Sequence, residues 1–156
     1  FAKSKLDEKD MLFLLSLLIV DKSDNFEFFI YKFNISKKDQ KRILFLNDYL
    51  KNKNNKNLNT KKLWKILYFN GKESLLDLIN YHIFISKKVD KKLVNFINFF
   101  NDKKVPLLPL RAITLMTKYN IPEGKELGLK LKKIEHRWVD NNFTISEKEV
   151  EKLIKS

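Results

Sequence analysis

The chain has 156 residues, of which 44% are hydrophobic, so it can bury the core of one compact domain or of two small ones. It contains no cysteine, which excludes disulfides and thiolate metal ligands. Its formal net charge of +13 favours polyanionic partners, nucleic acid before anionic membranes, although the abundance of lysine, asparagine, isoleucine and phenylalanine is also typical of an AT-rich genome.

Hydrophobic side chains recur at helical spacing along almost the whole chain, and no stretch alternates long enough to build a sheet. We therefore predict an all-α fold. The apolar run 11–20 is too short to span a bilayer, so we expect the first helix to be buried. The predicted helices span about residues 8–20, 25–33, 36–50, 60–70, 72–85, 87–101, a short stretch ending at 119, 123–140 and 146–155.

Polar residues mark the starts of two of these helices. Ser36 followed by Asp39 resembles a capping box, in which a hydroxyl and a carboxylate satisfy the first backbone amides. The polar segment 51–62 is interpreted as a surface loop, and Thr60 is predicted to cap the helix that follows it.

Two prolines mark the best candidate for a subdomain boundary. Pro106 and Pro109 lie in the stretch DKKVPLLPLR, where neither residue can continue a helix. We therefore predict a helical body over residues 1–102 and a smaller helical tail over residues 103–156.

The helix predicted over residues 123–140 has two different sides. Gly128 inside it costs up to about 1 kcal/mol relative to alanine, which predicts that another backbone passes close by. Lys130, Lys133 and Arg137 form a cationic stripe, although pairs such as Glu126 with Lys130 are also ordinary on exposed helices. The apolar stripe that should face the core consists of Leu127, Leu131, Ile134 and Trp138.

Two blocks of the sequence resemble the C-terminal body and tail of bacterial CCA-adding tRNA nucleotidyltransferases, which belong to the poly(A) polymerase family. Asn120 stands where that family often has glycine, and asparagine tolerates the left-handed conformation well. The tail block matches at Pro122, Glu123, Gly124, Leu127, Gly128, Leu131, Ile134, Glu135, Trp138 and Phe143. The body block, LWKILYFNGKESLLDLI, matches at Gly71, Lys72, Glu73 and Asp77.

The resemblance implies a tRNA-binding portion without a catalytic head. In the family, nucleotidyl transfer takes place in an N-terminal head that holds Mg²⁺ on an Asp-x-Asp pair and binds CTP or ATP, with a neck next to it. This chain has no Asp-x-Asp pair and only three glycines. It opens with Phe1 and not with methionine, so we expect a part of a longer protein, inactive alone and without a cofactor of its own. The expected partners are tRNA and the head and neck, and the expected location is the cytoplasm.

The candidate RNA-binding residues are lysines and one arginine on helices. Scarce arginine argues against reading of guanine edges, so we expect contacts to phosphates and to RNA shape. Asp7, Glu8 and Asp10 are interpreted as acidic residues at a helix start and not as metal ligands. The RNA-binding residues predicted in this way are Lys130, Lys133, Arg137, Lys72, Lys61, Lys62 and Lys65.

Two other functions remain open at this stage. A stand-alone basic helical adaptor would bind proteins through exposed phenylalanines, and a peripheral module would bind anionic membranes. The membrane function is the weaker of the two, because no helix combines an aromatic apolar side with lysines over its whole length. His82 and His136 have no recognisable serine or cysteine partner, so no nucleophilic chemistry is assigned to them.

Overall fold

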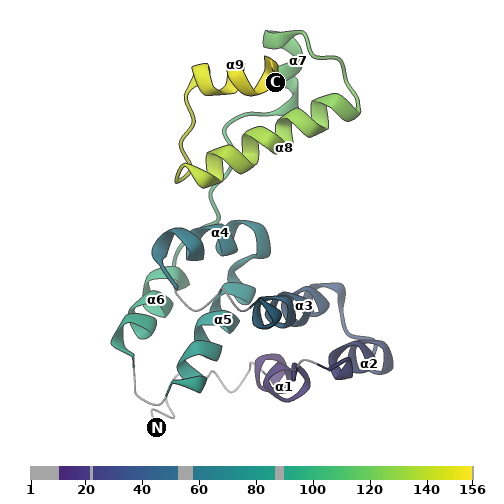
Figure 1. Ribbon diagram of the computed structural model, residues 1–156, viewed down its shortest axis with the longest axis vertical. Coiled ribbons are helices and arrows are strands. Elements are labelled where there is room, and N and C mark those ends of the chain that lie inside the picture. Colours follow the sequence, from purple (N-terminus) through teal and green to yellow (C-terminus); the bar gives the residue numbers. More distant parts are fainter. Residues whose placement is uncertain (1–10, 22, 53–57, 87–89, 156) are drawn as a thin grey trace. The chain divides into compact units, whose positions relative to one another are not determined.

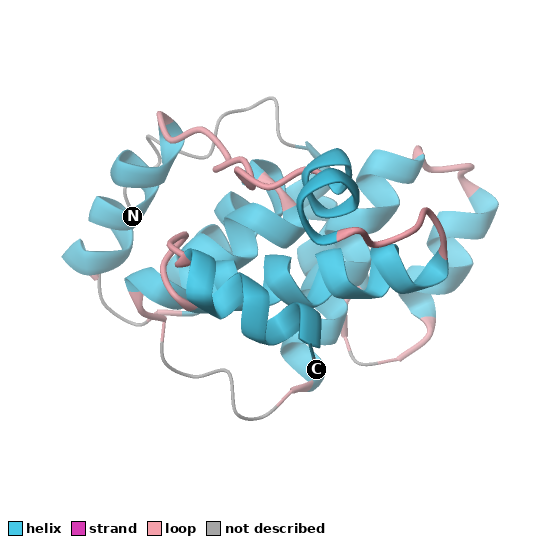
Figure 2. Ribbon diagram, turned by 90° about the horizontal axis from the view of Figure 1, so that it is seen from above, coloured by secondary structure: helices cyan, strands magenta, loops and turns pink. Residues whose placement is uncertain are grey.

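The computed structural model describes residues 11–21, 23–52, 58–86 and 90–155. All regular structure in these residues is helical, which confirms the predicted all-α class (Figures 1 and 2). Asp7, Glu8 and Asp10, the acidic residues of the first predicted helix start, lie outside the described residues. The helices are α1 Met11–Ile19, α2 Asn25–Lys32, α3 Lys37–Lys51, α4 Thr60–Asn70, α5 Lys72–Ile85, α6 Lys91–Asn101, α7 Ala112–Tyr119, α8 Lys125–Asp140 and α9 Glu147–Lys155.

The chain divides into two compact units, residues 1–105 and 106–156, three residues after the boundary predicted from the sequence. In unit 1, α5 is the central helix, and α3, α4 and α6 pack against it. α1 packs against α2 and α3. The core of unit 1 includes Leu46, Leu63, Leu67, Leu75, Leu78, Ile79 and Phe100.

The first helix is less buried than its sequence predicts. Phe13 and Ser16 are buried, but Met11 and Leu18 on the opposite side are 72% and 76% exposed. The Ser16 hydroxyl donates to the carbonyl of Leu12 at 2.7 Å, so the one polar side chain of α1 faces inward and is satisfied within the helix. The exposed side of α1 is therefore entirely apolar.

One of the two predicted helix caps is confirmed and the other is wrong. The Ser36 hydroxyl accepts from the Asp39 backbone N–H at 3.2 Å and donates to the Asp39 carboxylate at 2.8 Å. At α4 the cap is Asn59 and not Thr60: the Asn59 side chain accepts from the Lys62 N–H at 2.8 Å. Asn59 has the extended backbone that an N-cap requires, whereas Thr60 is already the first helical residue.

A buried ion pair joins α3 to α5. The Arg42 guanidinium donates from Nε and Nη2 to the two carboxylate oxygens of Asp77, at 2.8 Å and 2.7 Å. The side chains are only 11% and 6% exposed. Lys38 pairs with Glu73 at 2.8 Å on the exposed edge of the same contact. The sequence resemblance draws attention to Asp77 and Glu73 but not to either basic partner.

Unit 2 packs α8 between α7 and α9, and its core includes the stripe predicted to face inward: Leu127, Leu131, Ile134 and Trp138. Trp138 is buried, with its ring edge-on to Phe143 at a centroid distance of 5.0 Å. Asn120 ends α7 and has a φ of 53°. It therefore adopts the left-handed conformation, which asparagine tolerates well.

Gly128 does not mark a close approach of another backbone. A Cβ atom added at this position meets nothing within 4 Å among the residues that the structure describes. We therefore expect Gly128→Ala to stabilise unit 2 by roughly 0.5–1 kcal/mol, because alanine loses less conformational entropy in a helix. Urea unfolding followed by Trp138 fluorescence, in a Trp64→Phe background, measures this. Gly124→Ala is the control: φ is 148° there, so alanine must destabilise.

Candidate nucleic-acid interface

Positive charge is concentrated between the start of α3 and the end of α4. Residues 37–70 contain ten lysine and arginine residues and two acidic residues, a formal charge of +8. Residues 106–156, which include the predicted cationic stripe of α8, contain ten basic and seven acidic residues, a formal charge of +3. A polyanion is therefore attracted more strongly to the α3–α4 segment than to the tail.

Several helices of unit 1 begin with a pair of lysines. The N-terminus of a helix already carries a partial positive charge, so lysines there raise the local potential instead of neutralising it. The first turns of α4 and α6 contain no acidic residue. This signal is visible in the sequence as two lysines directly after a predicted helix start. The pairs are Lys37 and Lys38 in α3, Lys61 and Lys62 in α4, and Lys91 and Lys92 in α6.

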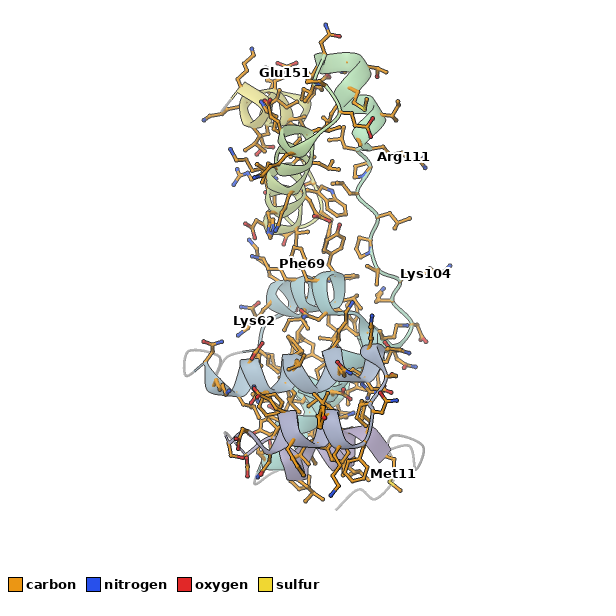
Figure 3. The ribbon with its side chains drawn as sticks, turned by 90° about the vertical axis from the view of Figure 1, so that its right-hand side faces the viewer. Met11, Lys62, Phe69, Lys104, Arg111 and Glu151 are labelled. Carbon is orange, nitrogen blue, oxygen red and sulfur yellow. The ribbon has the colours of Figure 1, made fainter. Side chains whose placement is uncertain are left out.

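Three lysines share one side of α4 and define the α4 lysine face: Lys61, Lys62 and Lys65. Lys61 is exposed, and Lys62 and Lys65 are half-buried. Phe69 follows seven residues after Lys62, a spacing of about two helical turns, and both residues are labelled in Figure 3. Phe69 is 47% exposed, and its ring is edge-on to Tyr68 at a centroid distance of 5.0 Å. The face thus combines cations with an exposed aromatic ring.

Lys62 also packs against α3. Its Nζ lies 5.1 Å from the ring centroid of Tyr49, whose hydroxyl is 3.3 Å from Nε2 of His82. Burial lowers the pKa of Lys62 and raises the pKa of Tyr49 to about 12. Burial, and then the charge of Lys62, lowers the pKa of His82, which favours the neutral imidazole. His82 is consequently a packed polar residue.

Lys72 is directed at the protein itself. Its ammonium donates to the carbonyl of Asn101 at 2.6 Å, which ties the start of α5 to the end of α6. Its charge lies at the C-terminal end of α6, where a cation stabilises the helix. This contact gives Lys72 a structural role that its sequence position did not predict.

Lys130 has a similar role in unit 2. Its ammonium donates to the carbonyl of Ile154 in the last turn of α9 and pairs with Glu126 at 3.2 Å. The side chain is only 19% exposed, so Lys130 fills the junction of α8 and α9. The cationic stripe predicted on α8 thereby has one of its three members committed to the fold.

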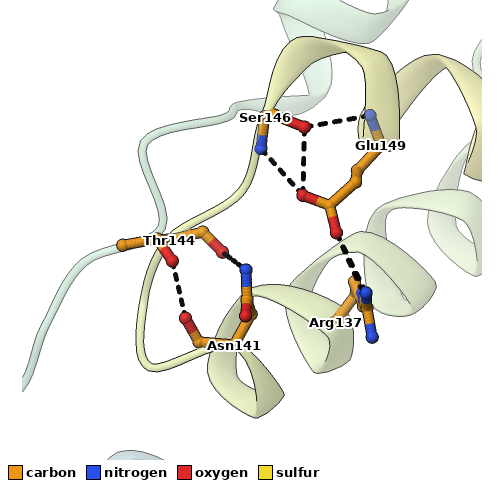
Figure 4. Close-up of polar contacts among 5 residues, drawn as sticks. All are labelled: Arg137, Asn141, Thr144, Ser146 and Glu149. Atoms are coloured by element: carbon orange, nitrogen blue, oxygen red, sulfur yellow. Dashed lines mark hydrogen bonds and ion pairs between the residues drawn. The ribbon is translucent and has the colours of Figure 1, made fainter.

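Arg137 is paired as well, with the first turn of α9 (Figure 4). Its Nη2 donates to Glu149 at 3.0 Å. The other carboxylate oxygen of Glu149 accepts from the Ser146 backbone N–H at 3.1 Å and from its hydroxyl at 3.0 Å, a capping box. Hydrogen bonds from Ser146, and then Arg137, lower the pKa of Glu149. The sequence SEKE carries the signal for this cap.

Lys133 and Arg137 are both exposed members of the predicted stripe, but Lys133, unlike Arg137, forms no ion pair with any residue that the structure describes. Glu126 and Asp140 on the same side reduce the net charge there. Lys133 lies in a shallow depression of α8 and α9 that is also lined by Leu129, Lys132, His136 and Leu153.

We expect Lys130→Met to destabilise unit 2 by about 1.5 kcal/mol, because the variant loses a charged hydrogen bond at the end of α9. RNA affinity should stay within about twofold of the unmodified chain, because the Lys130 ammonium is held by α9 and Glu126 and contributes no phosphate contact. Urea unfolding and tRNA binding measured on the same sample test both statements. Lys133→Met is the matched control, and its stability should change by less than about 0.5 kcal/mol. Equal destabilisation by the two variants would contradict the role given to Lys130.

Comparisons with protein-family models, with curated proteins and with solved structures return no match. None of the helices in the described part of the chain has both the length and the apolar character needed to cross a membrane. Residues 11–21, 23–52, 58–86 and 90–155 also contain no group of three or more His, Asp or Glu side chains placed to hold a metal ion.

Proposed function

We propose that this chain binds folded RNA, and tRNA in particular, mainly through contacts between lysines and phosphates. The observation that carries the proposal is the α4 lysine face, which lies in the most basic segment of the chain next to an exposed aromatic ring. Lysine ammonium groups bind phosphates as point charges and do not read base edges, which suits a partner that is recognised by shape. The choice of tRNA rests on the resemblance of the sequence to CCA-adding tRNA nucleotidyltransferases.

Within this proposal the chain is the tRNA-gripping portion of an enzyme that completes or repairs the 3′-terminal CCA of tRNA. Mg²⁺ and CTP or ATP would bind in the head of the parent protein, next to the neck, and the chain alone would transfer no nucleotide. The order of importance among the candidate residues changes: Lys61, Lys62 and Lys65 come first and Lys133 next. Lys72, Lys130 and Arg137 act chiefly in the fold.

A basic helical adaptor is the alternative function, and one observation favours it. The described part of α1 and α2 exposes large apolar side chains, including Phe28 at 63%. Such a patch is typical of a surface that binds another protein. An adaptor and an RNA-binding module differ in the effect of salt, because apolar contacts do not weaken when charges are screened.

The dependence of tRNA binding on salt tests the proposal. With about three phosphate contacts, the affinity should fall roughly 20- to 40-fold between about 50 and 200 mM salt. Filter binding or fluorescence anisotropy with labelled tRNA gives this value. An affinity for tRNA that is independent of salt would contradict the proposal, and so would the absence of tRNA binding in dilute buffer. The basic helical adaptor would then be the better supported function.

A further inference from the structure

The outer sides of α1 and α2 expose large apolar side chains, and the Lys32 ammonium lies 5.4 Å from the ring centroid of Phe28. Figure 1 shows the two helices side by side, and they contact each other. On α1, residues at helical spacing point outward and no polar group accompanies them, since Ser16 faces inward. We call this surface the α1–α2 apolar patch, and its members are Met11, Leu14, Leu18, Phe28 and Tyr31, which are 72%, 40%, 76%, 63% and 88% exposed.

A surface helix normally places its polar residues in water and its apolar residues in the core. In α1 the only polar residue, Ser16, is buried, and the exposed residues are apolar. The outer side of α1 therefore has the composition of an interior helix. Exposed apolar patches of this kind mark sites of association. We therefore expect this surface to bind a partner, and the charges around it restrict what that partner can be.

The charges at the patch differ from those of the rest of the chain. Residues 11–36 contain two lysines and three acidic residues, a formal charge of −1 against +13 for the whole chain. RNA is thus a poor occupant of this surface. A second copy that binds here meets a segment of charge −1, whereas two α3–α4 segments of charge +8 would repel each other.

The charges of α2 are also self-complementary. Asp24 and Glu27 lie at the first turn of α2, and Lys32 lies in its last turn. If two copies meet about a two-fold axis with their α2 helices antiparallel, Lys32 of each copy faces Asp24 and Glu27 of the other. The same arrangement sets the two helix dipoles antiparallel.

We propose that the α1–α2 apolar patch is the interface of a homodimer, in which α1 and α2 of two copies pack antiparallel about a two-fold axis. The proposal does not depend on RNA binding. It predicts the opposite response to salt: self-association strengthens as salt screens the repulsion between two chains of +13, whereas tRNA binding weakens.

Sedimentation velocity of the 156-residue chain at several protein and salt concentrations tests the proposal. We expect a dimer that becomes tighter with salt. Leu18→Glu should raise the dimer dissociation constant at least roughly tenfold, as expected for a charge at the centre of an interface. Leu107→Glu, at an equally exposed leucine of the segment between α6 and α7, should leave the dimer intact. Circular dichroism verifies that each variant is folded.

A charge exchange tests the antiparallel pairing. Lys32→Glu should weaken the dimer, and combining it with Glu27→Lys should restore much of the loss, because the pair is re-formed across the axis. A chain that remains monomeric at all concentrations would overturn the proposal. Retention of the dimer in Leu18→Glu would also overturn it, as would a monomer that binds neutral phosphatidylcholine vesicles through Leu18.

Discussion

Replacing Asp77 by alanine should destabilise unit 1 by about 3–5 kcal/mol, the usual cost of removing one member of a buried ion pair. The Arg42 guanidinium is 11% exposed and donates from Nε and Nη2 to the Asp77 carboxylate. In the variant this charge remains away from water between α3 and α5. A loss of this size is a large fraction of the stability of a small domain, about 5–15 kcal/mol.

Two further variants separate this effect from a general loss of packing. Replacing both Arg42 and Asp77 by apolar residues, Arg42→Met with Asp77→Leu, should restore most of the stability, because both buried charges are then removed. Asp48→Ala, at an exposed aspartate of α3, should change stability by less than about 0.5 kcal/mol. Urea unfolding followed by Trp64 fluorescence measures unit 1. If the double variant is as unstable as Asp77→Ala, the ion pair is not the cause.

Neutralising the α4 lysine face should weaken tRNA binding roughly 10- to 100-fold at physiological salt, the loss expected for about three phosphate contacts. The variant is Lys61→Gln, Lys62→Gln and Lys65→Gln together. Glutamine keeps the helix propensity and much of the aliphatic side chain while it removes the charge. Anisotropy with labelled tRNA gives the affinity, and unfolding measurements show whether the loss of the Lys62 contact with Tyr49 destabilises unit 1.

The matched control removes the same total charge elsewhere. Lys148, Lys152 and Lys155 are exposed lysines of α9, outside the α3–α4 segment, and their joint replacement by glutamine also lowers the net charge by three. We expect a loss of less than about threefold, due to the long-range field alone. If both triple variants lose affinity equally, binding depends on net charge and not on the α4 lysine face.

Helical periodicity predicted most of the fold, because it depends on neighbours along the chain. The helix cap at Ser36 and the left-handed Asn120 are local in the same sense, and the structure contains both. Asn59 and Thr60 show the limit of local reasoning: both residue types cap helices, and only the backbone conformation decides between them. The exposed side of α1 could not be predicted, since composition alone does not show which side a neighbour covers.

Contacts between distant residues account for what the sequence did not reveal about the candidate site. Arg42 and Asp77 are 35 positions apart, so no spacing rule pairs them. Lys130 and Lys133 belong to one stripe of α8, yet α9 covers only the first of them. Spacing along one helix predicts which side chains share a side of that helix. Whether each of these side chains is exposed or buried depends on where the neighbouring helix packs. The pairs of lysines at the starts of α3, α4 and α6 are also visible in the sequence.

The salt dependence of tRNA affinity tests RNA binding through α4 most directly. It is measured in parallel for the unmodified chain and for the triple variant of Lys61, Lys62 and Lys65. If these three ammonium groups neutralise phosphates, the slope of log affinity against log salt should become shallower by about 2–3, because fewer counterions are released. An unchanged slope would contradict the account, since it would mean that the phosphates are bound by other residues.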